Sequence, residues 1–106
     1  MANLNKVKSK PVQIELDKKR NLRYTLGSFA YLEETYGSID EAFAKMEKGS
    51  MNAIIDIIYA GLIHEDATLT KHQVSHMIDI SNMNDIVEQI TKAMNNDVNG
   101  TTTNPN

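Results

Sequence analysis

A chain of 106 residues has room for one domain with a modest hydrophobic core. Hydrophobic residues make up 41% and charged residues 24%, which is ordinary for a globular protein and argues against global disorder. The chain has no cysteine, which excludes a disulfide framework, a thiolate zinc site, an iron–sulfur cluster and a thiol nucleophile. This composition suits a reducing compartment, and we expect a cytoplasmic protein.

The net charge of −3 is unevenly distributed along the chain. The segment that ends at Arg23 has seven basic and two acidic residues, a balance of +5. The other residues have four basic and twelve acidic side chains, a balance of −8. A basic arm on an acidic body can steer an acidic partner, or a second copy of the chain, toward the arm. The alternative is that this segment is simply a solvated terminus.

No segment has the character of a membrane anchor. The N-terminal residues lack the apolar stretch of a secretory signal. The most apolar run, from Met51 to Ile63, is too short to cross a hydrocarbon layer of about 30 Å and is interrupted by Asn52, Asp56 and Gly61. We therefore expect no membrane partner and interpret this run as a core helix.

The first predicted element is a β-hairpin. Apolar and polar residues alternate from Val12 to Leu16 and again from Leu22 to Leu26, and a polar turn is predicted from Asp17 to Asn21. Two strands alone are marginally stable, so the apolar side of the hairpin must pack against helices.

Five helices are predicted after the hairpin from capping residues and apolar periodicity. The first opens at Gly27 and Ser28 and stops at Gly37. The second is predicted from Ile39 to before Gly49, behind a Ser38–Glu41 capping box, and the third runs through about Ile63 with Ser50 as its cap. The fourth follows Thr70, whose capping-box partner is Gln73, and the fifth is predicted from Met83 to Met94.

The predicted fold is mainly α, a small bundle of about five helices preceded by an N-terminal β-hairpin, or α+β at the margin. Residues 11–97 form its single domain. Residues 1–10 are expected to be a disordered lead-in and residues 98–106 a disordered tail, because neither has periodic apolar content.

A search for catalytic or metal-binding patterns finds one weak candidate. His72, His76 and Asp79 are spaced so that they could face one way on a helix, but the Glu of the zincin pattern is absent. Pairs of adjacent carboxylates point about 100° apart on a helix and cannot share a reacting atom. We therefore expect no catalytic residues, no metal, no cofactor and no enzyme activity.

A helix-turn-helix regulator is an alternative, because a short break separates the last two predicted helices. However, the would-be recognition helix from Met83 to Asp97 has one basic residue, Lys92, and three acidic residues. It would repel phosphate, so we expect no nucleic-acid partner.

Protein binding is the remaining class of function. Tyr31 lies off the buried stripe of its helix and could anchor an interface. For self-association we expect the basic hairpin turn of one copy to meet acidic helix positions of the next. The candidate protein-binding residues are Lys18, Lys19, Arg20, Tyr31, Glu33 and Glu34.

The stretch from Tyr24 to Phe43 resembles the tail assembly chaperones of long-tailed bacteriophages and gene transfer agents. Its Leu26-Gly27 pair, its Leu-Glu-Glu core and its Gly37-Ser38 break match the pattern of those proteins. The resemblance also takes in the preceding hairpin and the apolar third helix, and so spans roughly residues 12 to 80.

This resemblance implies a small helical protein that binds the tape-measure protein, keeps its long hydrophobic helices soluble and recruits tail-tube subunits. It also implies a possible homo-oligomer, and a polar C-terminal end would suit a linker to a longer frameshifted product. Another phage or prophage protein-binding adaptor is the closest alternative. Six methionines, whose flexible side chains suit adaptable contacts, agree with this role.

Overall fold

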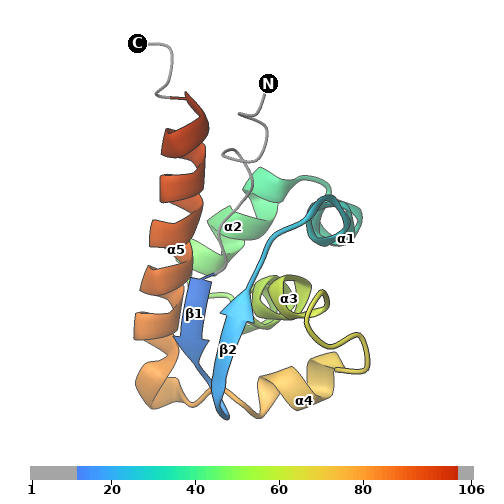
Figure 1. The fold of residues 1–106 in the computed structure, drawn as a ribbon, viewed down its shortest axis with the longest axis vertical. Helices are drawn as coiled ribbons and strands as arrows, with labels where there is room; N and C mark the ends of the chain where they lie inside the picture. Colours follow the sequence, from blue (N-terminus) through green and yellow to red (C-terminus); the bar gives the residue numbers. More distant parts are fainter. Residues whose placement is uncertain (1–11, 103–106) are drawn as a thin grey trace.

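The structure is a computed structural model that describes the backbone of residues 12–102 and the side chains from Val12 to Lys92. A two-stranded hairpin is followed by five helices (Figure 1). The elements are β1 Val12–Glu15, β2 Lys19–Leu22, α1 Leu26–Tyr36, α2 Ile39–Glu47, α3 Met51–Leu62, α4 Lys71–Ser75 and α5 Ile80–Thr102. The predicted fold class, mainly α with an N-terminal β-hairpin, is confirmed.

The hairpin is antiparallel, but its second strand lies earlier in the chain than the alternation of apolar and polar residues predicted. A tight turn places Lys19 opposite Glu15, and the ladder ends where Leu22 pairs with Val12. The predicted strand from Leu22 to Leu26 is wrong because the Arg23 N–H leaves the sheet and donates to the Gly61 carbonyl of α3, 2.9 Å away. The hairpin is therefore anchored to a helix at the residue where its own pairing stops.

Hydroxyl side chains cap the first two helices. The Thr25 hydroxyl accepts from the Ser28 N–H, and the Ser28 hydroxyl accepts from the Thr25 N–H. This capping box starts α1 at Leu26, slightly earlier than predicted. Gly37 ends the helix with a positive φ of 91°, a conformation that glycine adopts without strain. Ser38 then caps α2 by accepting from the Glu41 N–H, which is one half of the predicted Ser38–Glu41 capping box; the return bond from the Glu41 side chain is not formed.

Helix α3 is the centre of the core, as its apolar composition predicted. It contacts α1, α2, α4 and β2. The approach to β2 is closest at Gly61, where an added Cβ would lie 2.8 Å from the Tyr24 ring. The Tyr24 hydroxyl donates to the Ile57 carbonyl at 2.7 Å, so burying this tyrosine leaves no polar group unpaired.

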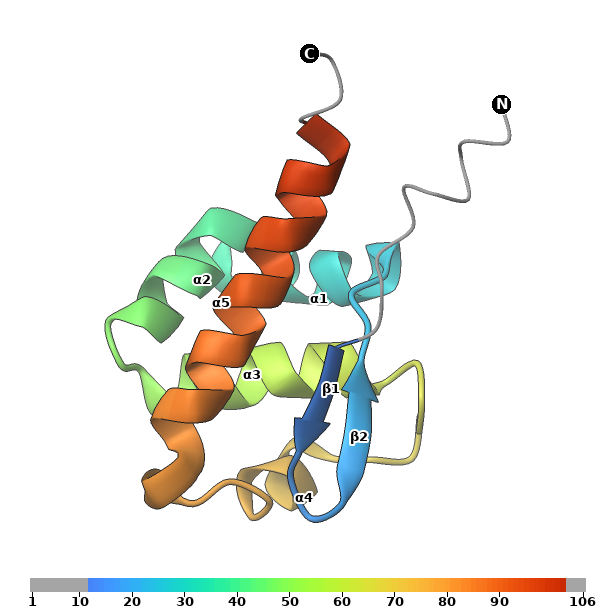
Figure 2. The ribbon, with the colours of Figure 1, turned by 60° about the vertical axis from the view of Figure 1, so that its left-hand side comes forward.

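The last two helices differ most from their predicted bounds. The Thr70–Gln73 capping box is present, but α4 ends at Ser75, so the predicted continuation through Ile78 is wrong. Helix α5 begins at Ile80 and runs antiparallel to β1, with its C-terminal end projecting beyond the body (Figures 1 and 2).

The helix α5 covers residues 98–102, where the sequence predicted a disordered tail. Each added helical residue gains a backbone hydrogen bond, so a helix anchored by buried Ile86 and Ile90 can extend past its apolar face. The predicted disordered lead-in at residues 1–10 and the end of the predicted tail at 103–106 lie outside the described residues.

The central position of α3 predicts a large cost for truncating Ile58, which is completely buried. Ile58→Ala should lower the free energy of unfolding by about 2–5 kcal/mol, because it removes buried methyl groups and leaves a cavity. Urea unfolding followed by circular dichroism measures this cost. Leu26→Ala, at a side chain that is 85% exposed, is the matched control and should change stability by less than about 0.5 kcal/mol. A loss under about 1 kcal/mol for Ile58→Ala would contradict the central role of α3.

Candidate protein-binding surface

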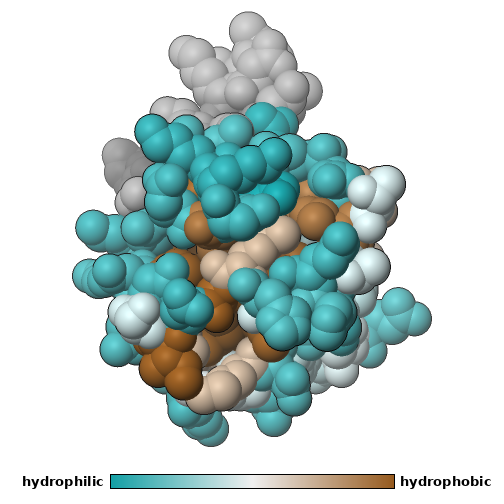
Figure 3. Space-filling model, turned by 90° about the horizontal axis from the view of Figure 1, so that it is seen from below, coloured by the Kyte–Doolittle hydropathy of each residue, from teal (hydrophilic) through white to brown (hydrophobic). Residues whose placement is uncertain are grey.

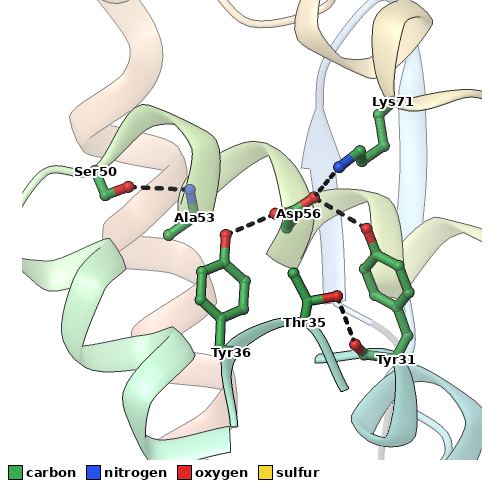
Figure 4. A network of polar contacts seen from close by, with 7 residues as sticks. All are labelled: Tyr31, Thr35, Tyr36, Ser50, Ala53, Asp56 and Lys71. Carbon is green, nitrogen blue, oxygen red and sulfur yellow. Dashed lines mark hydrogen bonds and ion pairs between the residues drawn. The ribbon is translucent and has the colours of Figure 1, made fainter. Parts of the chain in front are cut away.

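A buried carboxylate on α3 joins three helices (Figure 4). Asp56 is only 4% exposed. Its Oδ1 accepts from the Tyr31 hydroxyl at 3.0 Å and lies 3.0 Å from Lys71 Nζ, and its Oδ2 accepts from the Tyr36 hydroxyl at 2.6 Å. Two donors come from α1 and the cation comes from α4, so the network fixes both helices against α3.

The partners of Asp56 have shifted pKa values. Burial, followed by the hydrogen bond to Asp56, raises the pKa of Tyr36 well above its ordinary value. Burial and the Asp56 charge likewise raise the pKa of Tyr31. The hydrogen bond and charge of Asp56 raise the pKa of Lys71. The stability that each raised pKa contributes is fully present below the pKa of that group in the unfolded chain, and it is lost as the pH rises through the pKa of the group in the folded protein. This network therefore weakens in strong alkali.

An open groove lies beside this network, with α3 as its floor. Met51, Ile55 and Tyr59 follow one another at four-residue spacing on α3, and Met51 is 56% exposed. A hollow of about 510 Å³ opens between α3 and α4, and we call this hollow the α3 groove. The residues lining the hollow are Asn52, Ile55, Asp56, Lys71, His72 and Ser75.

A second apolar surface lies at the end of the molecule that bears the hairpin turn and α4. Viewed from this end, apolar side chains come to the surface in a hollow among polar ones (Figure 3). Ile80, the first residue of α5, is 76% exposed. Leu16, Met77 and Ile78 are partly buried against the core in the turn and in the α4–α5 connection. We call these four residues the end patch.

The basic residues predicted to bind protein are not equivalent. Lys18 and Lys19 are exposed at the hairpin turn. Arg20 lies within β2, is only 7% exposed and forms two hydrogen bonds to Asp17, at 2.7 and 3.0 Å. The predicted turn from Asp17 to Asn21 is therefore too long, because strand pairing turns the Arg20 side chain to the same face as buried Ile14. Two exposed lysines remain at the turn.

The predicted residues of α1 divide between two faces. Tyr31 is half-buried: its ring packs edge-on against Tyr59 at 5.5 Å between ring centroids, and its hydroxyl donates to Asp56. Glu33 and Glu34 are exposed. Glu34 lies three residues after Tyr31 and therefore on the same side of α1 as Tyr31. Glu33 lies seven residues after the exposed Leu26 and therefore on the same face of α1 as Leu26.

The histidine pattern does not form a metal centre in the part of the chain that the structure describes. The His72 and His76 rings lie 4.6 Å apart, but α4 ends before His76 and no group of three metal-ligating side chains occurs among the described residues. None of the helices in the described range is long and apolar enough to cross a membrane.

The residue that sequence reasoning placed wrongly is Asp56. In the sequence, Asp56 and Asn52 alike are polar interruptions of the apolar run from Met51 to Ile63, yet Asn52 is exposed and Asp56 is buried. The signal was present, since an acidic residue with isoleucines on both sides of it in the most apolar segment needs partners. Its partners lie 20 and 25 residues away on α1, which no local pattern indicates.

The fold and this surface define a class, a small helical domain with exposed apolar faces suited to contacts with other proteins. The family model described as phage tail assembly chaperone protein, TAC, matches residues 13–103. The chain therefore belongs to the phage tail assembly chaperone family. Comparisons with curated proteins and with solved structures give no match.

The Asp56 network predicts that one side chain supports two helices. Asp56→Ala should lower the free energy of unfolding by about 1–3 kcal/mol, because two tyrosine hydroxyls and Lys71 lose a shared acceptor. Thermal and urea unfolding measure the effect. Asp79→Ala, at an exposed aspartate, is the control and should stay within about 0.5 kcal/mol of wild type. Equal stability of the two variants would show that the network does not fix α1 and α4.

Proposed function

We propose that this protein is a tail assembly chaperone that binds the tape-measure protein and helps to recruit tail-tube subunits while the phage tail is built. The match to the chaperone family across residues 13–103 is the observation that carries this proposal. The exposed apolar side chains of Met51 on α3 and of Ile80 in the end patch support it, because a chaperone must cover apolar segments of its client.

The role is proposed to be non-enzymatic and to be carried out in the host cytoplasm. A chaperone family supports binding rather than catalysis. The helix-turn-helix alternative gains no support, because α4 has only five residues and the following helix bears mostly acidic charges. Another phage adaptor would use the same surfaces, so the client distinguishes the two roles.

Co-expression with the tape-measure protein of the same phage tests the proposed client. The tape-measure protein is expected to be insoluble alone, and to remain soluble and co-purify when this chain is present. The measurement is the soluble fraction and the stoichiometry of the purified complex. An unrelated helical protein of similar size and charge is the control. A tape-measure protein that is equally insoluble with this chain and with the control would refute the proposed client.

Self-association is a second part of the proposal. Lys18 and Lys19 lie beside the end patch, and the acidic residues Glu33 and Glu34 lie on α1, at the opposite end of the body (Figure 1). Complementary patches at opposite ends favour a head-to-tail contact between copies, which gives rings or open spirals rather than a two-fold dimer. Exposed ion pairs contribute only about 0–1 kcal/mol each, so the apolar end patch must supply most of the affinity.

Charge reversal at the turn tests this contact. The Lys18→Glu, Lys19→Glu double variant should shift the protein toward the monomer in light scattering at low salt, because it places acidic groups opposite acidic groups. Raising the salt concentration should weaken the wild-type assembly, since exposed charges are screened beyond about 8 Å at physiological ionic strength. The Lys45→Glu, Lys92→Glu double variant is a control that changes net charge equally at exposed positions on α2 and α5. Monomers in every condition, or oligomers that ignore both salt and charge reversal, would remove the turn from the contact.

A further inference from the structure

Three large apolar side chains are exposed among the residues whose side chains the structure describes. Ile80 lies in the end patch, Met51 begins α3, and Leu26, which begins α1, is the most exposed of the three at 85%. The end patch can supply the affinity of a contact between copies only if it meets an apolar surface on the neighbouring copy. Leu26 and Met51 are the two candidates for that surface.

Leu26 belongs to an exposed stripe on α1. Ala30 follows it by four residues and Glu33 by seven, so these three side chains lie on one side of the helix, and all three are exposed. The stripe is about 10 Å long at the rise of an α-helix. Leu32, on another side of α1, is fully buried in the core. We call Leu26, Ala30 and Glu33 the α1 outer stripe, which is apolar at its start and acidic at its end.

The end patch has a form that suits a protruding side chain. Its apolar side chains come to the surface in a hollow among polar ones (Figure 3). Leu16, Met77 and Ile78 are partly buried against the core, whereas Ile80 is largely exposed, so the patch has both recessed and raised apolar surface. The unbranched side chain of Met77 can adjust to a group that enters the patch. A leucine as exposed as Leu26 can therefore bury its side chain there.

The charges beside the two candidate surfaces distinguish them. On α1, Glu33 and Glu34 are exposed, and no residue of the helix is basic. Met51 instead follows an exposed lysine, Lys48, by three residues. The hairpin turn beside the end patch has two exposed lysines. An end patch docked on Met51 would bring lysine toward lysine, whereas an end patch docked on the α1 outer stripe brings these lysines toward glutamates.

Pairing of two end patches about a two-fold axis is the competing arrangement. It would bring the lysines of two turns together, with exposed Asp79 beside Ile80 offsetting part of the repulsion. It would also leave Leu26 uncovered in every copy. In a ring or spiral of head-to-tail contacts, each inner copy covers both Leu26 and Ile80, so this arrangement removes more apolar surface from water.

We propose that the α1 outer stripe of one copy binds the end patch of the next copy, with Leu26 seated in the patch and the turn lysines beside the α1 glutamates. This deepens the self-association part of the proposed function and rests on it, because it names the apolar surface that receives the end patch. The two surfaces lie at opposite ends of the body, so each added copy leaves one of them free for the next (Figure 1).

Two charged variants of the full chain, used separately and then mixed, test this contact. Leu26→Asp and Ile80→Asp each place a charge in a surface that the contact must keep dry. In sedimentation velocity, either variant alone should associate at least tenfold more weakly than wild type. An equal mixture of the two should form a one-to-one complex that grows no further, because the intact patch of one meets the intact stripe of the other. Met51→Asp, at the third exposed apolar side chain, is the matched control and should associate within twofold of wild type.

The mixture separates this contact from its alternatives. If Ile80→Asp fails to associate but Leu26→Asp associates like wild type, the end patch pairs with another surface and the proposal is overturned. A mixture that contains no one-to-one complex overturns it equally. Circular dichroism and thermal unfolding check that each variant folds, and Leu26→Ser and Ile80→Ser replace any aspartate variant that lowers the stability.

The wild-type protein separates failure of this contact from failure of the proposed function. A wild-type chain that stays monomeric at every protein and salt concentration would refute the self-association part of that function, and this contact with it. Association of wild type that Leu26→Asp leaves unchanged would refute this contact alone. Solubility of the co-expressed tape-measure protein is measured separately and decides the client.

Discussion

The carboxylate of Asp56 is the point at which α1, α3 and α4 are held together. A charge inside the most apolar helix is costly unless it is paired and hydrogen-bonded. Here two tyrosine hydroxyls and a lysine amine meet that need, and they come from helices on either side of α3. The cost of burying the carboxylate therefore sets the positions of α1 and α4. Because Asp56 and Lys71 both line the α3 groove between α3 and α4, the shape of the groove depends on the same interaction.

The opposite side of α3 is held by the contact between Gly61 and Tyr24. Gly61 lets the Tyr24 ring approach the helix more closely than any side chain there would allow, and the tyrosine hydroxyl donates to the Ile57 carbonyl. The hairpin is thus fixed to one side of α3, and the other side remains open as the floor of the groove. A small core can leave one face of its central helix exposed when polar networks on both sides keep that helix in place.

The positions of the α3 groove and the end patch follow from this arrangement of the helices and the hairpin. The α3 groove lies between α3 and α4, while the end patch and the two exposed lysines lie at the hairpin turn. Family membership places this chain among phage tail assembly chaperones.

Local chemistry predicted most of the elements. The serine and threonine caps before α2, α3 and α4 accept from backbone N–H groups as their spacing indicated, and Gly37 ends α1 with positive φ. These features need only neighbouring residues, so a sequence pattern can show them. The resemblance that ran from Tyr24 to Phe43 correctly indicated the family.

By itself, the amino-acid sequence determined the fold class, the approximate positions of the helices and the central place of α3, because hydrophobic periodicity and capping are local properties of the chain. Only the tertiary structure decided that Asp56 is buried, that Arg20 is paired within the hairpin and that β2 ends at Leu22. It also decided that α3 and α4 leave a hollow between them beside Asp56. Each of these outcomes depends on groups far apart in the sequence, such as Tyr36 beside Asp56 and Gly61 beside Arg23, whose contacts exist only once the chain has folded.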